Sequence, residues 1–360
     1  MENCVLVGMS GGVDSSVAAY LLRQQGFRCM GATMRLYDNE TIGKESGTCC
    51  SLDDVEDAKS VARRLGIPHY TFNFKDDFEK CVIQKFVSCY EQGLTPNPCI
   101  DCNRYLKFDR LLRRARELGC DYVASGHYAQ IRQDEAAGHF LLYKAADRSK
   151  DQTYFLACLD QEQLSHILFP LGGLTKTEVR QIAQEQGFVN ARKRDSQDIC
   201  FVPDGDYGAF LERYTGKIYP QGDYLDLEGK VVGRHQGAVR YTLGQRKGLG
   251  IALGAPVYVC GKDMEKNTVT VGGNDALFSH ALRASGWNWY PFPALMEPIT
   301  VTVKIRHSQS EQPAIVYPEE DGFARVEFQQ PQRAITPGQA VVLYQGDMVV
   351  GGGTITEAIA

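Results

Sequence analysis

The chain has 360 residues, of which 39 are basic and 44 acidic, so its net charge is −5. This charge excludes a general polycation, and any nucleic acid must be bound by a local group of basic residues. The length predicts two or three domains, and 43% hydrophobic with 23% charged residues excludes a disordered or collagen-like chain. No stretch approaches the roughly 18 apolar residues of a membrane span, and no signal-peptide pattern is present. We therefore expect a cytoplasmic protein with no membrane partner.

The chain contains twelve cysteines. This density is well below that of a disulfide-stapled scaffold, and in a reducing compartment thiols are more often buried, metal-binding or catalytic than paired. Most of the cysteines carry no recognisable motif and are interpreted as small buried hydrophobic residues. Those without an expected role are Cys4, Cys29, Cys81, Cys89, Cys120, Cys158 and Cys260.

Strand and helix patterns alternate in the first half of the chain. The expected elements are strands at 5–7, 28–35, 69–74 and 121–125, and helices at 14–25, 53–65, 77–92 and 103–118. A further helix opens with a capping box at Thr175 and is closed by Gly187. This alternation is typical of a doubly wound α/β domain with a parallel sheet, whose ligands bind at the carboxyl ends of the strands.

From about residue 205 an alternating pattern replaces the helical one. The expected strands are 223–232, 257–260, 268–271, 300–305, 324–328 and 340–344, separated by Gly and Pro. This pattern predicts two small, mostly β domains. The tryptophans and prolines between Ser285 and Pro298 suggest the boundary, which gives domains of 1–204, 205–285 and 286–360.

A glycine loop, residues 8–16, follows the first predicted strand and opens the first predicted helix. In this position backbone N–H groups and the helix dipole can bind a phosphate. The loop has no lysine, which excludes a P-loop, and its glycine spacing differs from that of a dinucleotide-binding fingerprint. A tight strand-to-helix turn with a good N-cap is the purely structural alternative. The loop reads Gly8, Met9, Ser10, Gly11, Gly12, Val13, Asp14, Ser15 and Ser16.

The string from Ser10 to Ser15 resembles the pyrophosphate loop of ATP pyrophosphatases, which adenylate a carbonyl oxygen and release pyrophosphate. Further strings narrow the resemblance to one family. They are residues 95–103 (TPNPCIDCN), 125–129 (SGHYA), 150–156 (KDQTYFL), 198–201 (DICF), 241–250 (YTLGQRKGLG), 332–334 (QRA) and 337–339 (PGQ). Together these strings look like those of the tRNA-specific 2-thiouridylases, in order along nearly the whole chain.

The resemblance implies replacement of the 2-oxygen of the anticodon wobble uridine by sulfur. AMP is first transferred from ATP to that oxygen; a sulfur carried by the protein then attacks C2, and AMP leaves. Adenylation splits one difficult step into two easier ones, and Mg²⁺ would neutralise the charge that develops on pyrophosphate. The implied fold is an N-terminal ATP pyrophosphatase domain followed by two small β domains, the last a β-barrel. The implied partners are tRNA and a sulfur-donor protein or sulfide, and we expect a monomer.

The resemblance also implies residue roles. Cys102 and Cys200 match the catalytic pair, Cys200 carrying a persulfide and Cys102 taking part in sulfur release. The residues matching the ATP site are Gly8, Met9, Ser10, Gly11, Gly12, Val13, Asp14, Ser15, Met34 and Gly126. Those matching tRNA contacts are Asn97, Pro98, Cys99, His127, Lys150, Asp151, Gln152, Arg306, His307 and Gln339. Met34 would otherwise be interpreted as a core residue, and His307 departs from the tyrosine often found there.

The chain departs from the common family pattern at Cys99, where many members carry an aspartate. Catalytic cysteines react as thiolates, and a helix beginning at Asn103 would lower the pKa of Cys102. Cys99, Cys102 and Cys200 resemble the three ligands of a [4Fe–4S] cluster in related thiolases. Two alternatives remain: Cys99 packs or forms a disulfide with Cys102, or the cysteines bind zinc. A zinc site would need a fourth ligand, such as Cys49 or Cys50.

Two local basic groups could bind an RNA backbone. The predicted helix at 103–118 carries Arg104, Lys107, Arg110, Arg113, Arg114 and Arg116, and a second group is Arg192, Lys193 and Arg194. A stacked base must be extruded before its C2 can react, so phosphate contacts near the catalytic loop would position the anticodon stem. A solvated helix face is the alternative interpretation.

Two other functions remain open. The same chemistry could act on another uridine, for example in ribosomal RNA, or the chain could be a catalytically silent RNA-binding homologue. The intact glycine loop, Cys102 and Cys200 favour an enzyme. A second glycine-rich segment, 233–251, has no nucleophile geometry, and we expect it to be structural or to close over bound tRNA.

Overall fold

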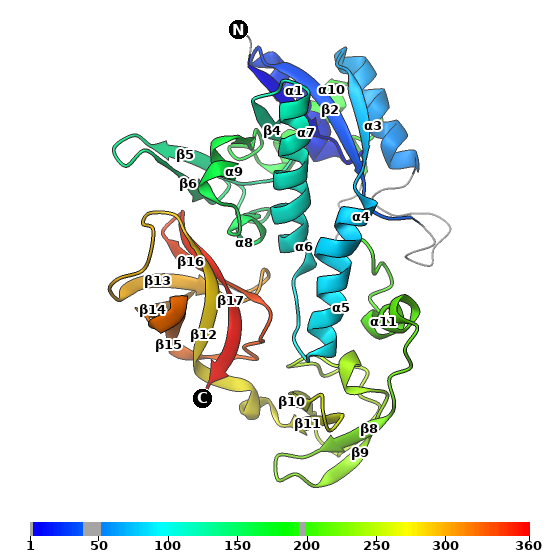
Figure 1. The fold of residues 1–360 in the computed structure, drawn as a ribbon, viewed down its shortest axis with the longest axis vertical. Coiled ribbons are helices and arrows are strands. Elements are labelled where there is room, and N and C mark those ends of the chain that lie inside the picture. Colours follow the sequence, from blue (N-terminus) through cyan, green and yellow to red (C-terminus); the bar gives the residue numbers. More distant parts are fainter. Residues whose placement is uncertain (1–2, 39–51, 194–198) are drawn as a thin grey trace. The chain divides into compact units, whose positions relative to one another are not determined.

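A computed structural model describes residues 3–38, 52–193 and 199–360. The chain forms two compact units (Figure 1). Unit 1 comprises Met1–Ile83, Pro98–Gly205 and Gly346–Val350, and unit 2 comprises Gln84–Asn97, Asp206–Gln345 and Gly351–Ala360. Over the described residues, no helix combines the length and apolar character needed to cross a membrane.

Unit 1 contains a five-stranded sheet with the order β3-β2-β1-β4-β7, and all its neighbouring strands are parallel. The strands are β1 (Cys4–Gly8), β2 (Arg28–Arg35), β3 (His69–Asn73), β4 (Tyr122–Ala124) and β7 (Ile167–Leu168). The described helices of this unit are α1 (Val13–Gln24), α3 (Leu52–Leu65), α4 (Lys75–Phe78), η1 (Glu79–Ile83), α6 (Pro98–Asp101), η2 (Cys102–Arg110), α7 (Leu111–Glu117), α8 (Thr153–Leu156), α9 (Gln161–Ser165) and α10 (Lys176–Glu185). A hairpin of β5 (Gln130–Asp134) and β6 (His139–Tyr143) also belongs to it.

The central strand β1 is apolar along its length because helices cover the sheet. Val5 and Val7 are fully buried in a cluster with side chains of α1, α3 and α10, while α7 contacts β1 and β4. Fully burying a valine contributes roughly 1.5–3 kcal/mol, so this strand is a main source of stability for the sheet. The expected parallel α/β fold is confirmed. The carboxyl ends of β1 and β4 bring the glycine loop and the segment after Ala124 to the same edge.

The helix expected at 103–118 begins earlier than predicted. Pro98 is its first helical residue, a position that suits proline because the first N–H of a helix has no partner within it. Cys102 and Asn103 therefore lie inside the helix, in the π-helical stretch η2, and not just before its N-terminus. The expected helix at Thr175 is confirmed, including its capping box with Glu178.

Unit 2 contains a four-stranded sheet and a closed barrel. The sheet has the order β10-β11-β8-β9, formed by β8 (Gly222–Leu225), β9 (Val231–His235), β10 (Tyr258–Asp263) and β11 (Thr268–Gly272). The barrel strands follow the order β12-β15-β14-β13-β16-β17, and pairing of β12 with β17 closes it. They are β12 (Phe278–Trp289), β13 (Ile299–Lys304), β14 (Gln312–Pro318), β15 (Ala324–Arg333), β16 (Ala340–Gln345) and β17 (Met348–Ile359). The expected β-rich second half with a terminal barrel is confirmed.

Strand β12 runs through the domain boundary expected near Ser285. It pairs with β15 from Phe278 and with β17 as far as Trp289, so its whole length belongs to the barrel. Short helices complete the described part of this unit: α5 (Gln84–Glu91), α11 (Tyr207–Thr215), η3 (Ala238–Arg240), η4 (Asn274–Leu277) and η5 (Glu320–Gly322).

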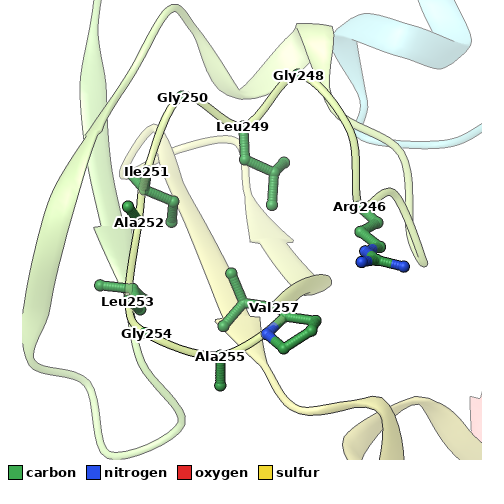
Figure 2. A pocket seen from close by; sticks show the side chains of 11 residues that line it. Arg246, Gly248, Leu249, Gly250, Ile251, Ala252, Leu253, Gly254, Ala255 and Val257 are labelled. Atoms are coloured by element: carbon green, nitrogen blue, oxygen red, sulfur yellow. The ribbon is translucent and has the colours of Figure 1, made fainter.

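A glycine-rich loop between η3 and β10 surrounds a pocket of about 410 Å³ (Figure 2). Residues 248–257 line it together with Arg246, and Gly248, Gly250 and Gly254 have positive φ angles that side-chain-bearing residues rarely adopt. Apart from Arg246, the lining is apolar side chains and backbone. The loop therefore presents no nucleophile, in agreement with the sequence interpretation of this segment.

Candidate functional site

The glycine loop connects β1 to α1 and is fixed at both ends by hydrogen bonds. The backbone N–H of Met9 donates to the carbonyl of Ala32 at 2.7 Å, and the Thr33 hydroxyl donates to the carbonyl of Met9 at 2.7 Å. Within the loop, the Ser15 hydroxyl accepts from the N–H of Ser10 at 3.2 Å and donates to the carbonyl of Gly12 at 3.2 Å. These hydrogen bonds join the loop to β2 and to the first turn of α1.

The start of α1 has the character of an anion site. In the described part of the chain, the N–H groups of Gly11, Gly12 and Val13 have no hydrogen-bond acceptor, and no side chain caps the helix. Such N–H groups at a helix N-terminus bind phosphates. Gly126 packs directly on this turn, because a Cβ at this position would lie 2.6 Å from the backbone of Asp14 and Ser15. The geometry therefore requires glycine at 126, whether or not it also contacts adenosine.

The acidic side chain of the loop, Asp14, is neutralised by Lys176. The Lys176 ammonium lies 2.7 Å from both carboxylate oxygens of Asp14, and the Tyr128 hydroxyl donates to the same carboxylate at 2.8 Å. Lys176 is only 9% exposed. The sequence did not predict either partner of Asp14. Lys176 follows the N-cap residue of α10 and was considered only as part of that helix start, and no local pattern links Tyr128 to the loop.

Met34 lies near the carboxyl end of β2 and is half-buried. Neighbouring β1 ends at Gly8, which pairs with Ala32. Met34 therefore lies at the same edge of the sheet as the glycine loop, where the adenosine of a nucleotide bound to the loop could reach it. Its assignment to the ATP site stays a prediction.

Cys102 is buried in η2, at 8% exposure. Burial raises the pKa of its thiol to about 11, while the nearby Lys107 ammonium acts in the opposite direction. The expectation that a helix N-terminus lowers this pKa is therefore wrong, because the helix begins at Pro98, four residues before Cys102. Of the groups that shift this pKa, only the Lys107 ammonium lowers it. In this arrangement Cys102 is a protonated thiol at neutral pH.

We expect the reactivity of Cys102 to rise with pH and not level off near pH 8.5. Because alkylation requires the thiolate, its rate with iodoacetamide should increase about tenfold per pH unit between pH 7 and 10. Peptide-resolved mass spectrometry of the native protein measures this rate, with the exposed Cys99 on the same peptide as the internal reference. Lys107→Met should slow alkylation further. A plateau below pH 9 would contradict the assignment.

Cys200 is partly buried and lies beside an aromatic cluster. The Tyr37 hydroxyl donates to the backbone carbonyl of Cys200 at 3.0 Å, and the ring of Phe201 packs edge-on against Phe78 at 5.7 Å between centroids. These contacts anchor the segment at both its cysteine and the next residue. They leave the role of the Cys200 sulfur as a prediction.

The described residues include no group of three Cys, His, Asp or Glu side chains placed to hold a metal ion. Cys99, Cys102 and Cys200 all lie in this part of the chain, yet Cys102 is buried and Cys99 is exposed. The three sulfurs are thus not arranged as ligands of a [4Fe–4S] cluster, because a cluster needs them to converge on one point. Cys49 and Cys50, the extra zinc ligands considered, lie outside the described residues.

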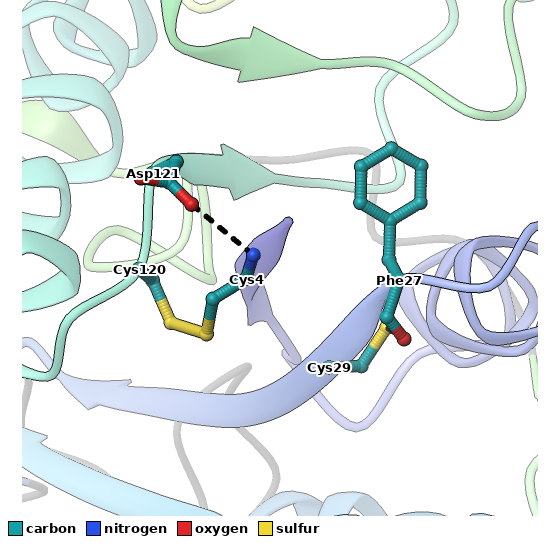
Figure 3. Close-up of a disulfide and its surroundings, with 5 residues drawn as sticks. All are labelled: Cys4, Phe27, Cys29, Cys120 and Asp121. Atoms are coloured by element: carbon teal, nitrogen blue, oxygen red, sulfur yellow. Dashed lines mark hydrogen bonds between the residues drawn. A yellow bond between two sulfur atoms is a disulfide. The ribbon is translucent and has the colours of Figure 1, made fainter. Parts of the chain in front are cut away.

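Two of the cysteines to which no role was given are bonded to each other. Cys4, the first residue of β1, forms a disulfide with Cys120, which precedes β4, and their Cα atoms are 4.4 Å apart (Figure 3). The N–H of Cys4 also donates to the Asp121 carboxylate at 3.3 Å. The expectation of separate buried thiols is wrong for this pair, because parallel pairing of β1 with β4 juxtaposes positions 116 apart in sequence. Cys29 remains a buried thiol, and burial raises its pKa to about 11.

The predicted tRNA contacts in unit 1 have internal partners. His127 shares a 2.7 Å hydrogen bond with the Ser125 hydroxyl, and burial lowers the pKa of His127 well below its ordinary value, so its ring is neutral. The Gln152 side chain accepts from the N–H of Tyr128 at 2.9 Å, and the Asp151 carboxylate accepts from the N–H of Ala145 at 2.8 Å. Gln152 therefore supports the tyrosine that holds Asp14. Lys150 is half-buried.

The predicted tRNA contacts in unit 2 are similarly anchored. The Gln339 side chain donates to the carbonyl of Thr95 at 2.8 Å, which fixes the segment leading to Asn97. The Arg306 guanidinium donates to the carbonyl of Ala334 at 2.8 Å, while His307 is exposed. In unit 1, Pro98 is buried at the start of α6, and Cys99 next to it is exposed. Of all the predicted tRNA contacts, the exposed His307 and Cys99 are the side chains best placed for an external ligand.

Most of the expected basic residues are neutralised by acidic neighbours. On the helix, Arg110 pairs with Asp77, and the other arginine pairs are Arg113 with Asp109, Arg114 with Glu117 and Arg116 with Glu162. Lys193 pairs with Asp54 and Asp57 at 2.6 and 2.7 Å, which neutralises its charge, and its expected contact with RNA phosphates stays a prediction. Arg192 is exposed, and Arg194 lies outside the described residues. Arg104 and Lys107 have no ion pair among the described residues.

A parallel sheet whose first strand feeds a helix N-terminus through an uncapped glycine loop defines a nucleotide-binding α/β domain. Residues 3–204 match the family model described as "tRNA methyl transferase HUP domain". Residues 208–273 match "tRNA methyl transferase PRC-barrel domain", and residues 279–355 match "Aminomethyltransferase beta-barrel domain".

Proteins named tRNA-specific 2-thiouridylase MnmA match nearly the full chain. That of Acetivibrio thermocellus is 53% identical over 354 residues, covering 98% of both chains. That of Heliobacterium modesticaldum is 51% identical, covering 99% of this chain and 93% of the relative, and that of Clostridioides difficile is 47% identical, covering 100% and 99%. The chain belongs to the tRNA-specific 2-thiouridylase family.

Proposed function

We propose that this chain is an ATP-dependent tRNA-uridine 2-sulfurtransferase that makes 2-thiouridine at the anticodon wobble position. The observation that carries the proposal is that about half of all residues, across essentially the whole chain, are identical to those of three relatives named tRNA-specific 2-thiouridylase MnmA. The uncapped glycine loop supports it, since such a loop suits the pyrophosphate that adenylation releases.

The first step transfers AMP from ATP to the 2-oxygen of uridine and releases pyrophosphate. In this proposal the N–H groups of residues 11–13 bind the departing phosphates, while Lys176 and Tyr128 hold Asp14 in place. Met34 and Gly126 lie next to the adenosine. Mg²⁺ bound to the ATP phosphates would neutralise the charge that develops on pyrophosphate.

The second step replaces the activated oxygen by sulfur. The terminal sulfur of a Cys200 persulfide attacks C2 of the base, and AMP leaves with the original oxygen. The Cys102 thiolate then attacks the inner sulfur of Cys200, which frees the new thiocarbonyl and leaves a Cys102–Cys200 disulfide. A thiol reductant must open that disulfide before the next turnover. The raised pKa of Cys102 is consistent with a thiol that stays inactive in the absence of tRNA.

The same proposal assigns recognition of tRNA. Asn97, Pro98 and Cys99 line the extruded base, and the other contacts are His127, Lys150, Asp151, Gln152, Arg306, His307 and Gln339. The N-terminal domain, 1–204, carries both chemical steps, and the C-terminal barrel, which begins with β12 at Phe278, also contacts tRNA. Sulfur reaches Cys200 from a donor protein that carries a persulfide, or from sulfide that attacks the Cys102–Cys200 disulfide at the Cys200 sulfur and releases the Cys102 thiolate. The enzyme acts in the cytoplasm as a monomer.

Nucleoside mass spectrometry tests this function. A strain lacking the gene should lose wobble 2-thiouridine from its tRNA, and the wild-type gene should restore it while Cys200→Ser does not. Purified enzyme with ATP, a persulfide-carrying sulfur donor and a thiol reductant should thiolate unmodified tRNA and leave ribosomal RNA unmodified. Unchanged 2-thiouridine in the deletion strain would refute the proposal, and thiolation of ribosomal RNA alone would establish the other uridine substrate.

A further inference from the structure

The conformation of the glycine loop depends on contacts from two other segments of unit 1. Gly11 has a φ of +74°, and a Cβ on it would lie 2.3 Å from the carbonyl oxygen of Asp54 in α3. The α3 backbone therefore packs tightly on one side of Gly11. The carbonyl oxygen of Gly11 accepts hydrogen bonds from a second segment, residues 190–193, which follows α10.

Asn190 is the main donor to this carbonyl. Its side-chain amide donates to the Gly11 oxygen at 2.9 Å and to the Ser16 hydroxyl at 2.9 Å, so it joins the loop to the first turn of α1. The side chain is 3% exposed, and its own oxygen has no partner among the described residues. A buried amide with one unsatisfied atom costs stability. A position as buried as this one would otherwise favour an apolar residue. The contribution of the amide is therefore the two hydrogen bonds that it donates to the loop.

Lys193 provides a charged contact to the same point. Its ammonium lies 3.4 Å from the Gly11 oxygen, 2.6 Å from the Asp54 carboxylate and 2.7 Å from that of Asp57. Burial lowers the pKa of Lys193, but the hydrogen bonds to Asp54 and Asp57 outweigh this effect and the net shift is upward. The lysine is therefore charged at neutral pH and ties α3, the loop and segment 190–193 together.

We propose that Asn190 and Lys193 are positioning residues for nucleotide binding: they hold the Gly11 carbonyl away from the phosphates so that the N–H group of Gly12, which belongs to the same peptide, faces them. If the peptide between Gly11 and Gly12 turned over, a carbonyl oxygen would face the phosphates in place of an N–H group. The inference rests on the proposed function, since it assumes that ATP binds at this loop.

Two substitutions that preserve size test the proposal. Asn190→Leu and Lys193→Met should each raise the Kd for ATP and its KM in pyrophosphate release about tenfold, equivalent to about 1.4 kcal/mol. The turnover number at saturating ATP should change less than about threefold, because neither residue touches the reacting atoms. Lys193→Arg should restore most of the affinity. The assays use full-length protein with Mg·ATP and unmodified tRNA, and thermal unfolding is recorded for each variant.

Lys59→Met is the matched control, because Lys59 also pairs with an acidic residue of α3 but is exposed and, over the described part of the chain, does not contact the glycine loop. Asp57→Asn should weaken ATP binding in the wild type and have no further effect in Lys193→Met, since the two act through one contact. Variants that lose thermal stability but bind ATP normally would overturn the proposal and leave a structural role. If the wild-type enzyme itself releases no pyrophosphate, it is the proposed function that fails.

Discussion

Replacing Cys200 with serine should reduce tRNA thiolation by at least about a thousandfold while leaving adenylation of tRNA intact. Serine cannot carry a persulfide, so no sulfur is delivered to the activated base, but the glycine loop and its partners are untouched. Cys102→Ser should have the same outcome with one difference, namely that a covalent Cys200–S–S–tRNA adduct accumulates, because no thiol is present to release the thiolated base. Pyrophosphate release reports the first step, and mass spectrometry of nucleosides and of the Cys200 peptide reports the second.

Cys81→Ser is the matched control for these variants. Cys81 is partly buried, as Cys200 is, and lies in η1, where we propose no chemistry. The Cys81→Ser enzyme should thiolate tRNA at a rate close to that of the wild type. Persisting thiolation in Cys200→Ser would disprove the persulfide assignment, and loss of pyrophosphate release in the same variant would show that Cys200 also supports the ATP-dependent step.

Lys176→Met should slow pyrophosphate release about 100-fold, which corresponds to about 2.7 kcal/mol. The substitution leaves Asp14 without its countercharge beside the bound phosphates. Removing one partner of a fully buried ion pair costs about 3–5 kcal/mol, and the expected effect is smaller because the Asp14 side chain is 28% exposed. Lys176→Arg should retain more activity than Lys176→Met, since it keeps the positive charge.

Lys59→Met tests whether loss of any lysine near the sheet has this effect. Lys59 forms an ion pair with Glu56 within α3, and both side chains are exposed at 41% and 60%. Such surface pairs contribute little, so the enzyme should be unaffected. If Lys176→Met released pyrophosphate at the wild-type rate, the pairing with Asp14 would have no part in ATP chemistry.

Local signals were sufficient wherever a short segment determines its own structure. The apolar run at β1, the glycine loop and the capping box at Thr175 all appeared where they were expected, because strand preference, positive φ angles and helix capping are marked by the residue types of a short segment. The start of the helix around Cys102 was misplaced by five residues. Pro98 begins it, and the five residues from Cys99 to Asn103 gave no periodic pattern from which its true start could be recognised.

What the sequence by itself determined is the class of fold, the glycine loop and its family resemblance, since these reside in contiguous strings of residues. Only the tertiary structure decided which charged groups and thiols are unpaired and can bind a ligand or react. The disulfide of Cys4 with Cys120, the pairing of Lys176 with Asp14 and the neutralisation of Lys193 all join residues more than 100 positions apart. A charge or thiol acquires its pKa and its role from the neighbours that folding brings to it, and those neighbours are set by strand order and helix packing.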